Sequence, residues 1–242
     1  MIDRVFVIMP AYNAAKTIER VFDRIPEEAK QRIERYVVVN DGSKDSTADA
    51  VRRIQQSWDN LVLLEHDGNQ GYGAAEKTLL NYALSEGANL AILLHSDGQY
   101  SPEKIPGILR IFDGDEADIV QGSRMAGESN ALGEMPFYKY VANKGLTAIE
   151  NWAFGLNLAE YHSGYMIYNR HALETIPFNN LSGSFDFDLE MLVLARVKGL
   201  RVKELPIPTI YADEKSNLNP ITYGLDVLRV VCDYKRGKYH RL

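Results

Sequence analysis

The segment LAILLHSDGQYSPEKI, Leu90–Ile105, changes abruptly from apolar to polar residues. Its first five residues place apolar side chains on both faces of an extended chain, which is typical of a central strand. Asp97 stands where that strand would leave the sheet. Ser101-Pro102-Glu103 then opens a helix, because proline fits the first turn of a helix. The segment therefore predicts an α/β unit with a polar loop at the carboxyl end of its strand.

Short β-branched runs alternate with helix-period segments along the first half of the chain. This alternation is typical of an α/β fold, so we expect a mostly parallel central sheet flanked by helices, in a single domain. Asn13 is expected to cap the first helix. The other expected strands are Val5–Met9, Tyr36–Val39, Leu61–Leu64, Asp118–Val120 and Val202–Leu205, and the expected helices are Ile18–Ile25, Ser46–Ile54, Gly73–Ser85, Tyr138–Phe154, Leu189–Val197 and one from Tyr223.

The composition narrows the class of protein. A chain of 242 residues with 45% apolar residues can bury one substantial core. Its net charge of −6 argues against a nucleic-acid partner, since affinity for nucleic acid comes mostly from positive charge. The single cysteine, Cys232, excludes an internal disulfide and fits a reducing compartment. The N-terminus lacks a signal-peptide pattern and no apolar run approaches the roughly 20 residues of a membrane span, so we expect a cytoplasmic protein.

Polar clusters follow three of the expected strands: Pro10-Ala11-Tyr12-Asn13, Asn40-Asp41-Gly42-Ser43 and His95-Ser96-Asp97-Gly98-Gln99. Each one alone could be ordinary turn chemistry. Together they would share the carboxyl edge of a parallel sheet, where ligands bind, and this favours a nucleotide site. Asp41 could accept a hydrogen bond from ribose or base, and Tyr12 could pack against the base. Gly71 and Gly73 could approach a diphosphate closely, although such glycines are more often simple turns.

Eight motifs, taken in their order along the chain, resemble those of the family-two inverting glycosyltransferases of the GT-A fold, near the dolichyl-phosphate mannose synthase branch. They are PAYN, VVNDGS, NQGYGAA, SDGQYSPEKI, DIVQGSR, EYHSGYMIYNR, FDFDLEM and ELPIPTIY. The resemblance covers about residues 3–218. It implies one GT-A domain over 1–218, with a nucleotide-binding half of about 1–124 and an acceptor-facing half of about 125–218. Residues 219–242 would follow as an amphipathic helix and a basic tail.

The resemblance also implies a donor site for a nucleoside-diphosphate sugar, linked to GDP or UDP. In the family, the segments that match Pro10, Ala11, Tyr12, Asn13 and Asp41 hold the base and ribose, and we add Gly71, Gly73 and Ser96 to the expected donor contacts. Asp97 would bind the divalent metal, Mg²⁺ or Mn²⁺, with Gln99 as second ligand. Arg124 of GSR would face phosphates. His95 stands where relatives carry an aspartate, and a hydrogen-bonding role is favoured over metal ligation.

The acceptor implied by the resemblance is a polyprenyl or dolichyl phosphate, which is already anionic and needs no strong base. A hydroxyl acceptor on a glycan or small molecule would instead need a base, and Asp188 is the candidate. The alternative for Asp188 is a favourable charge at a helix start, and for Asp186 the helix cap is favoured. Asp97, Asp188 and Arg124 are thus the expected catalytic residues.

EYHSGYMIYNR places polar residues around an expected strand, and from it we select His162 and Arg170 as acceptor or phosphate contacts, together with Arg124 and Lys139. Relatives often carry arginines where this chain has Met166 and Ile210, which leaves Lys144 and Lys215 as further possible cations. These departures, with His95, also suggest a third function: a nucleotide-sugar-binding protein that has lost catalysis.

Apolar residues recur with helical spacing near the C-terminus, at Ile221, Leu225, Leu228, Val231 and Cys232. Such a stripe usually packs on its own domain, and we expect that here. The chain then ends KRGKYHRL, a basic tail that could meet anionic lipid headgroups at the cytoplasmic face of a membrane. We therefore expect peripheral membrane contact, directly or through a partner.

Overall fold

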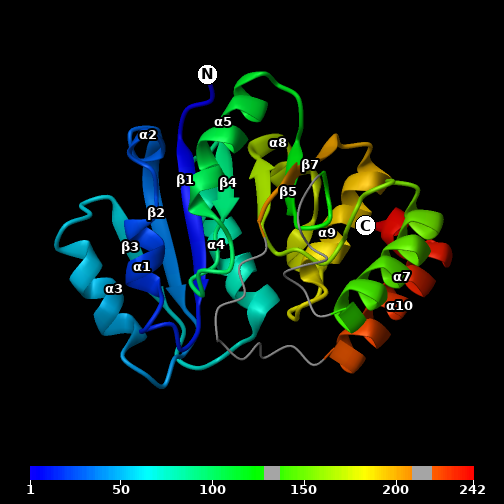
Figure 1. Cartoon of the computed structure of the whole chain (residues 1–242), viewed down its shortest axis with the longest axis horizontal. Helices are drawn as coiled ribbons and strands as arrows, with labels where there is room; N and C mark the ends of the chain where they lie inside the picture. Colours follow the sequence, from blue (N-terminus) through cyan, green and yellow to red (C-terminus); the bar gives the residue numbers. More distant parts are fainter. Residues whose placement is uncertain (128–136, 209–219) are drawn as a thin grey trace.

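The computed structural model describes residues 1–127, 137–208 and 220–242 (Figure 1). In these residues seven strands form one sheet in the order β3-β2-β1-β4-β6-β5-β7. Only β6 runs antiparallel to its neighbours, so the prediction of a mostly parallel sheet is confirmed. The strands are β1 Val5–Ala11, β2 Ile33–Asn40, β3 Leu61–Glu65, β4 Leu90–Leu93, β5 Ile119–Ser123, β6 Met166–Asn169 and β7 Val202–Pro206.

β4 occupies the middle of the sheet, as its apolar sequence predicts. It pairs with β1 on one side and with β6 on the other. All four of its residues are buried, because helices cover both faces of the sheet at this point. The carboxyl ends of β1, β2 and β4 consequently open on the same edge, which is the lower edge in Figure 1.

Two layers of helices enclose the sheet (Figure 1). One core cluster joins a face of the sheet to α1, α3 and α5, and the other cluster joins the opposite face to α4, α8 and α9. The helices of the two layers are α1 Ile18–Asp23, α3 Thr47–Gln55, α5 Ile105–Asp113, α4 Tyr72–Ser85, α8 Arg170–Thr175 and α9 Phe187–Lys198, with the short α2 Glu27–Lys30 and the 3-10 turns η1 Pro102–Lys104, η2 Phe178–Asn180 and η3 Tyr239–Arg241.

Two further helices, α7 Phe137–Phe154 and α10 Pro220–Lys235, lie outermost and pack against each other. Within the described residues, no helix is long and apolar enough to cross a membrane.

The prediction that the C-terminal apolar stripe packs on its own domain is wrong for most of its members. Val231 is buried, but Ile221, Leu225, Leu228 and Cys232 are exposed. The packing face of α10 is formed by Val227, Val230 and Val231 instead. Both faces of this helix carry apolar residues, so helical spacing alone does not identify the face that is buried.

Asn13 does not cap the first helix as predicted. α1 begins at Ile18, after Thr17. Asn13 lies in the left-handed region with φ of 54°, and its side chain accepts a hydrogen bond from the backbone N–H of Lys44 at 2.9 Å. Asparagine tolerates this conformation well, and the bond ties the loop after β1 to the loop after β2.

Candidate functional site

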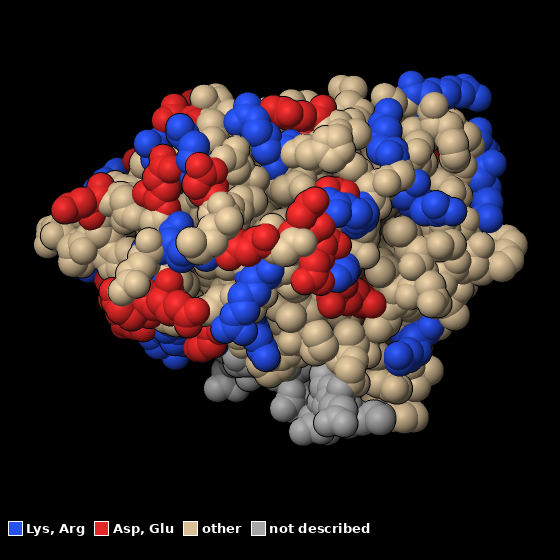
Figure 2. Space-filling view, turned by 90° about the horizontal axis from the view of Figure 1, so that it is seen from above, with Lys and Arg blue, Asp and Glu red and all other residues tan. Residues whose placement is uncertain are grey.

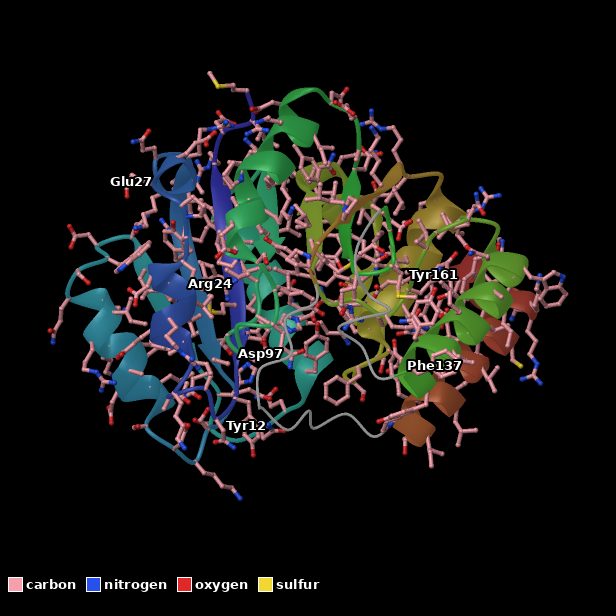
Figure 3. All side chains as sticks on the ribbon, viewed as in Figure 1. Tyr12, Arg24, Glu27, Asp97, Phe137 and Tyr161 are labelled. Carbon is pink, nitrogen blue, oxygen red and sulfur yellow. The ribbon has the colours of Figure 1, made fainter. Side chains whose placement is uncertain are left out.

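The three polar clusters that follow β1, β2 and β4 converge, as their order in the sequence predicts. The backbone N–H of Asp41 donates to the carbonyl of Ala11 at 2.9 Å. The Ser96 hydroxyl donates to the carbonyl of Pro10 at 2.8 Å. These bonds hold the loop after β1 between the other two, so a ligand at this edge would meet all three loops. The expected donor contacts Tyr12 and Asp97 lie along this edge in Figure 3.

Asp41 is buried, and its carboxylate binds the backbone of the loop that leads into α4. It accepts hydrogen bonds from the backbone N–H groups of Gln70 at 2.8 Å and Gly71 at 3.0 Å. Its Oδ1 also lies 2.7 Å from Nδ1 of His66. Gly71 has φ of 98°, a conformation that favours glycine. Asp41 thus fixes the turn at Gln70 and Gly71, directly before α4, and its contact with ribose stays a prediction.

The loop after β4 presents one carboxylate and one amide. Asp97 is half-buried, and its Oδ1 accepts from the backbone N–H of Gln99 at 2.9 Å. No group of three or more His, Cys, Asp or Glu side chains that could hold a metal occurs in the described part of the chain. A hard divalent cation, however, often takes only one or two protein oxygens and completes its shell with substrate phosphates and water. Asp97 and Gln99 carry oxygen donors of the kind that such a cation takes, and their role as ligands stays a prediction.

His95 makes a hydrogen bond within the protein. Its Nε2 lies 2.9 Å from the Tyr72 hydroxyl, and its ring packs edge-on against Tyr100. Burial lowers the pKa of His95, and the nearby negative charge of Asp97 only partly opposes this. The imidazole is therefore neutral near pH 7, in line with the hydrogen-bonding role favoured from the sequence.

Gly164 packs directly against the contact between Tyr72 and His95. A Cβ on this residue would lie 2.5 Å from the Tyr72 hydroxyl oxygen and 2.9 Å from Nε2 of His95. Only glycine fits here without displacing those two side chains.

Tyr72 links His95 to a pair of buried acids, Asp188 and Glu76. The Tyr72 hydroxyl donates to Oδ2 of Asp188 at 2.8 Å, and Phe185 stacks on its ring. Burial raises the pKa of Asp188 to about 7. The fully buried Glu76 also has a pKa well above its usual range, because of burial and then of the neighbouring charge of Asp188. Two such groups disfavour joint ionisation, so the pair retains a proton at neutral pH.

Two of the expected acceptor or phosphate contacts, Arg124 and His162, lie near one another. The Arg124 guanidinium donates to the buried carboxylate of Glu160 at 2.7 Å and to the carbonyl of His162 at 2.7 Å. His162 Nε2 lies 3.2 Å from the fully buried Glu150, and its Nδ1 lies 3.2 Å from the Tyr223 hydroxyl of α10. Each of the two residues thus already has a protein partner.

Arg170 lies at the opposite edge of the sheet, which contradicts its expected place among the phosphate contacts. Its backbone N–H donates to the carbonyl of Asn89, directly before β4, whereas Asp97 follows the end of β4. The reason is that β6 runs antiparallel, so its carboxyl end points away from the site. The Arg170 side chain pairs with Glu174 instead.

The remaining positions named from the sequence divide into buried, exposed and undescribed ones. Met166 is fully buried in the core, so this position packs β6 and does not face a ligand. Lys144 is exposed on α7. Ile210, Lys215 and the side chain of Lys139 lie outside the described residues.

Asp186 holds the N-cap position of α9, as the sequence favours, but its side chain does not cap the helix. Its buried carboxylate accepts from the Ser182 hydroxyl at 2.6 Å and from Arg229 of α10 at 2.5 Å. Asp188, in the first turn of α9, is the acid that contacts Tyr72.

Sequence reasoning missed Glu76 and the bridging hydroxyl of Tyr72. Both lie on one face of α4, a turn apart, with Leu79, Leu80 and Ala83. A glutamate among buried positions of a helix was therefore a readable signal, since acids are rarely buried without a partner or a role. Its partner Asp188 lies more than a hundred residues away and could not be identified from spacing.

Comparison with known proteins connects this arrangement to a family. A family model described as glycosyl transferase family 2 matches residues 6–176. An uncharacterised protein of Methanocaldococcus jannaschii is 30% identical over 87% of this chain and 83% of its own length. The UDP-N-acetylglucosamine–dolichyl-phosphate N-acetylglucosaminyltransferase of Methanococcus voltae is 27% identical over 86% of each chain. The undecaprenyl-phosphate mannosyltransferase of Micrococcus luteus is 26% identical over 84% of this chain and 82% of its own.

Solved structures agree on the fold. Glucosyl-3-phosphoglycerate synthase from Mycobacterium tuberculosis, in complex with UDP, covers 95% of this chain and 79% of its own, with a TM-score of 0.68 and 17% identity. The same enzyme with Mn²⁺, UDP and phosphoglyceric acid has a TM-score of 0.64 and 16% identity. At this identity the likeness concerns the fold.

Proposed function

Because the chain belongs to glycosyl transferase family 2, whose model matches residues 6–176, we propose that it transfers a sugar from a nucleoside-diphosphate donor to a polyprenyl phosphate. The observation that carries the acceptor class is the similarity, over most of both chains, to transferases named for dolichyl phosphate and undecaprenyl phosphate. The convergence of the loops after β1, β2 and β4 supports a donor site at that edge.

In the proposed reaction a phosphate oxygen of the acceptor attacks the anomeric carbon, the bond from that carbon to the diphosphate oxygen breaks, and the configuration inverts. Negative charge grows on the departing nucleoside diphosphate. Asp97 and Gln99 would hold a divalent cation, Mg²⁺ or Mn²⁺, which when bound neutralises part of that charge. Pro10, Ala11 and Tyr12 would meet the nucleoside.

Arg124 is the proposed cation for a phosphate group. Its guanidinium is already paired with Glu160, yet an arginine offers five N–H donors in a rigid fork and can serve two anions. Glu160 would then set the direction of the fork. The negatively charged Glu160 lowers the net attraction for a phosphate, so Arg124 would act more by orientation than by charge.

A second candidate function, transfer to a hydroxyl, is favoured by one observation. Asp188 lies one hydrogen bond from Tyr72, and its pKa of about 7 suits a general base at neutral pH. A base works only when deprotonated, so transfer to a hydroxyl should rise with pH through about 7. Transfer to a lipid phosphate needs no such base and should lack this dependence on Asp188.

Replacement of Asp188 by asparagine separates the two functions. We expect the Asp188→Asn variant to retain most of its transfer to polyprenyl phosphate, measured as lipid-linked sugar formed from a radiolabelled donor. A loss of at least about a hundredfold in transfer to a hydroxyl acceptor, with donor affinity unchanged, would establish Asp188 as a base and favour the hydroxyl function. Glu174→Asn, at an exposed position, is the matched control.

The proposal as a whole is tested with purified chain, UDP and GDP sugars, Mn²⁺ and polyprenyl phosphate. We expect one donor to stabilise the fold in a thermal-shift screen and to yield a lipid-linked sugar. Donor binding without transfer to any lipid phosphate, glycan or small-molecule hydroxyl would instead support the third function, a binding protein without catalysis.

A further inference from the structure

Eight large apolar side chains are exposed on the two outer helices, α7 and α10. Exposed apolar residues scattered over a surface are ordinary, but a contiguous group marks an interaction site. We call this group, with the exposed basic residues of the same segments, the α7/α10 face. Its basic members are Lys144, Arg229, Lys235, Arg236, Lys238 and Arg241. Its apolar members are Phe137, Tyr138, Val141, Ile149, Trp152, Ile221, Leu225 and Leu228, with relative exposures from 40% to 78%.

Unlike an ordinary surface helix, α7 carries apolar side chains on its exposed side, and its buried side combines Ala153 and Phe154 with polar residues. Its buried positions on the inner side include the polar residues Asn143, Thr147 and Glu150. Its exposed positions carry the apolar side chains, and their spacing places them along one stripe. A helix normally turns its apolar side to the core, so the outward stripe of α7 calls for an apolar environment outside the chain.

The charges on these elements differ in sign from those of the whole chain. Residues 137–154 and 220–242 contain seven Lys and Arg against three Asp and Glu, whereas the complete chain has 27 against 33. Of the three acids, Glu150 is fully buried, and Asp226 and Asp233 lie within ion-pair distance of Arg229 and Lys238. Figure 2 shows Lys and Arg at the end of the molecule where α7 and α10 lie, with most Asp and Glu elsewhere.

We propose that the α7/α10 face docks on an anionic lipid bilayer. Apolar side chains would enter the headgroup region, and the basic residues beside them would meet anionic lipids. This inference rests on the proposed function, because a polyprenyl phosphate is held in a membrane. Figure 3 supports the geometry, since Phe137 at the start of α7 lies toward the same edge of the molecule as Tyr12 and Asp97. Docking would therefore present the site to the acceptor.

A second copy of the chain is a poorer occupant of this face. A symmetric dimer would bring the same basic residues against themselves, and like charges across an interface cost affinity. An anionic bilayer meets both the apolar and the basic character of the face.

The test is flotation of the full chain with vesicles of phosphatidylcholine, alone or mixed with phosphatidylglycerol. We expect flotation with the anionic vesicles and its loss at high salt. Two double variants address the face, Val141→Ser with Leu225→Ser, and Arg236→Glu with Arg241→Glu. All four side chains are exposed, so the fold should persist. The matched control, Arg20→Glu with Arg110→Glu, makes the same charge change at exposed positions of α1 and α5.

Each face variant should lower the affinity for anionic vesicles at least about tenfold, and the control should change it less than about threefold. Equal flotation of wild type and both face variants would overturn the proposal, as would a solution dimer that Val141→Ser with Leu225→Ser dissociates. These vesicles contain no acceptor, so the result is independent of turnover. Transfer to a water-soluble short isoprenyl phosphate, measured in parallel, tests the proposed function separately.

Discussion

At the scale of single residues, the buried acids Glu76 and Asp188 give stability a pH dependence. The folded-state pKa of Glu76 is raised by burial, so the folded chain retains a proton that the unfolded chain releases above about pH 4.5. The stability from this proton is complete at low pH and falls as pH rises toward the raised pKa. Asp188 acts in the same direction, up to its pKa of about 7.

Replacement of Glu76 by glutamine should remove the part of the stability loss at rising pH that comes from ionisation of Glu76. The difference in free energy of unfolding between Glu76→Gln and wild type should shift by about 1–3 kcal/mol in favour of the variant when the pH is raised from 5 to 8. The reason is that glutamine does not ionise, whereas Glu76 does. Urea denaturation at both pH values measures the change. The control Glu174→Gln, at an exposed site, should show little difference. A constant gap between Glu76→Gln and wild type at both pH values would contradict the prediction.

Asp97 carries the second prediction at this scale. Asparagine keeps an acceptor for the backbone N–H of Gln99 but removes the charge that would hold a metal. We expect Asp97→Asn to weaken Mn²⁺-dependent donor binding at least about tenfold while changing stability by less than about 1 kcal/mol. Calorimetric titration of donor with and without Mn²⁺ is the measurement, and Asp49→Asn on α3 is the control. Full retention of metal-dependent binding would remove Asp97 from the site.

At the scale of elements, the start of α4 is fixed by close packing against the segment before α9. A Cβ on Gly73 would lie 2.7 Å from the carbonyl oxygen of Ser182 and 2.9 Å from that of Ser184. Both neighbours are backbone atoms, which cannot rotate away. The first turn of α4 and this segment must therefore stay in register, and the contact brings Tyr72 to Asp188.

Two glycine substitutions compare this packing with an open helix position. Gly73→Ala should destabilise the fold by about 1–3 kcal/mol, because the methyl group forces the backbone apart. Gly145→Ala in α7, where an added Cβ meets nothing within 4 Å, should stabilise it by about 0.5–1 kcal/mol through helix propensity. Urea denaturation of both variants measures the two effects. Equal stability of Gly73→Ala and wild type would show that the contact is looser than described.

At the scale of the whole molecule, the C-terminal segment is tied to the rest of the chain through two acids at the start of α9, Asp186 and Glu190. Arg229 of α10 pairs with the buried Asp186, and the Tyr239 hydroxyl donates to Glu190 at 2.7 Å. Asp186 and Glu190 also bind Ser182, through its hydroxyl and its backbone N–H. The segment 220–242 thus packs against the half of the molecule that carries Asp188, as expected, although not through most of the expected apolar residues.

Loss of the Arg229 contact tests this attachment. Arg229→Gln should destabilise the fold by about 1–2 kcal/mol, since Asp186 would lose its cationic partner while staying buried, although the half-exposed arginine limits the effect. Arg236→Gln, at an exposed position on the same segment, should change stability by less than about 0.5 kcal/mol. Thermal and urea denaturation measure both changes. Equal stability of Arg229→Gln and wild type would show that the pair of Arg229 with Asp186 does not hold the segment in place.

Some features could be predicted because their signal is local. The strand Leu90–Leu94 was placed in the middle of the sheet from its apolar side chains on both faces, and β4 lies there. Strand order at the carboxyl edge follows from parallel topology, so the meeting of the segments around Tyr12, Asp41 and Asp97 was also predictable. Arg170 was misplaced because periodicity shows where a strand lies and leaves its direction open.

The sequence by itself determined the fold class, the family and the loops that converge on the proposed donor site, because period, turn chemistry and motif order are properties of neighbouring residues. The tertiary structure decided the rest: the reversed direction of β6, the pairing of Glu76 with Asp188, and the outward apolar side of α7 and α10. Each of these depends on contacts between residues distant along the chain. Burial and proximity set the pKa of an acid and the face of a helix that meets solvent, and the folded chain alone establishes both.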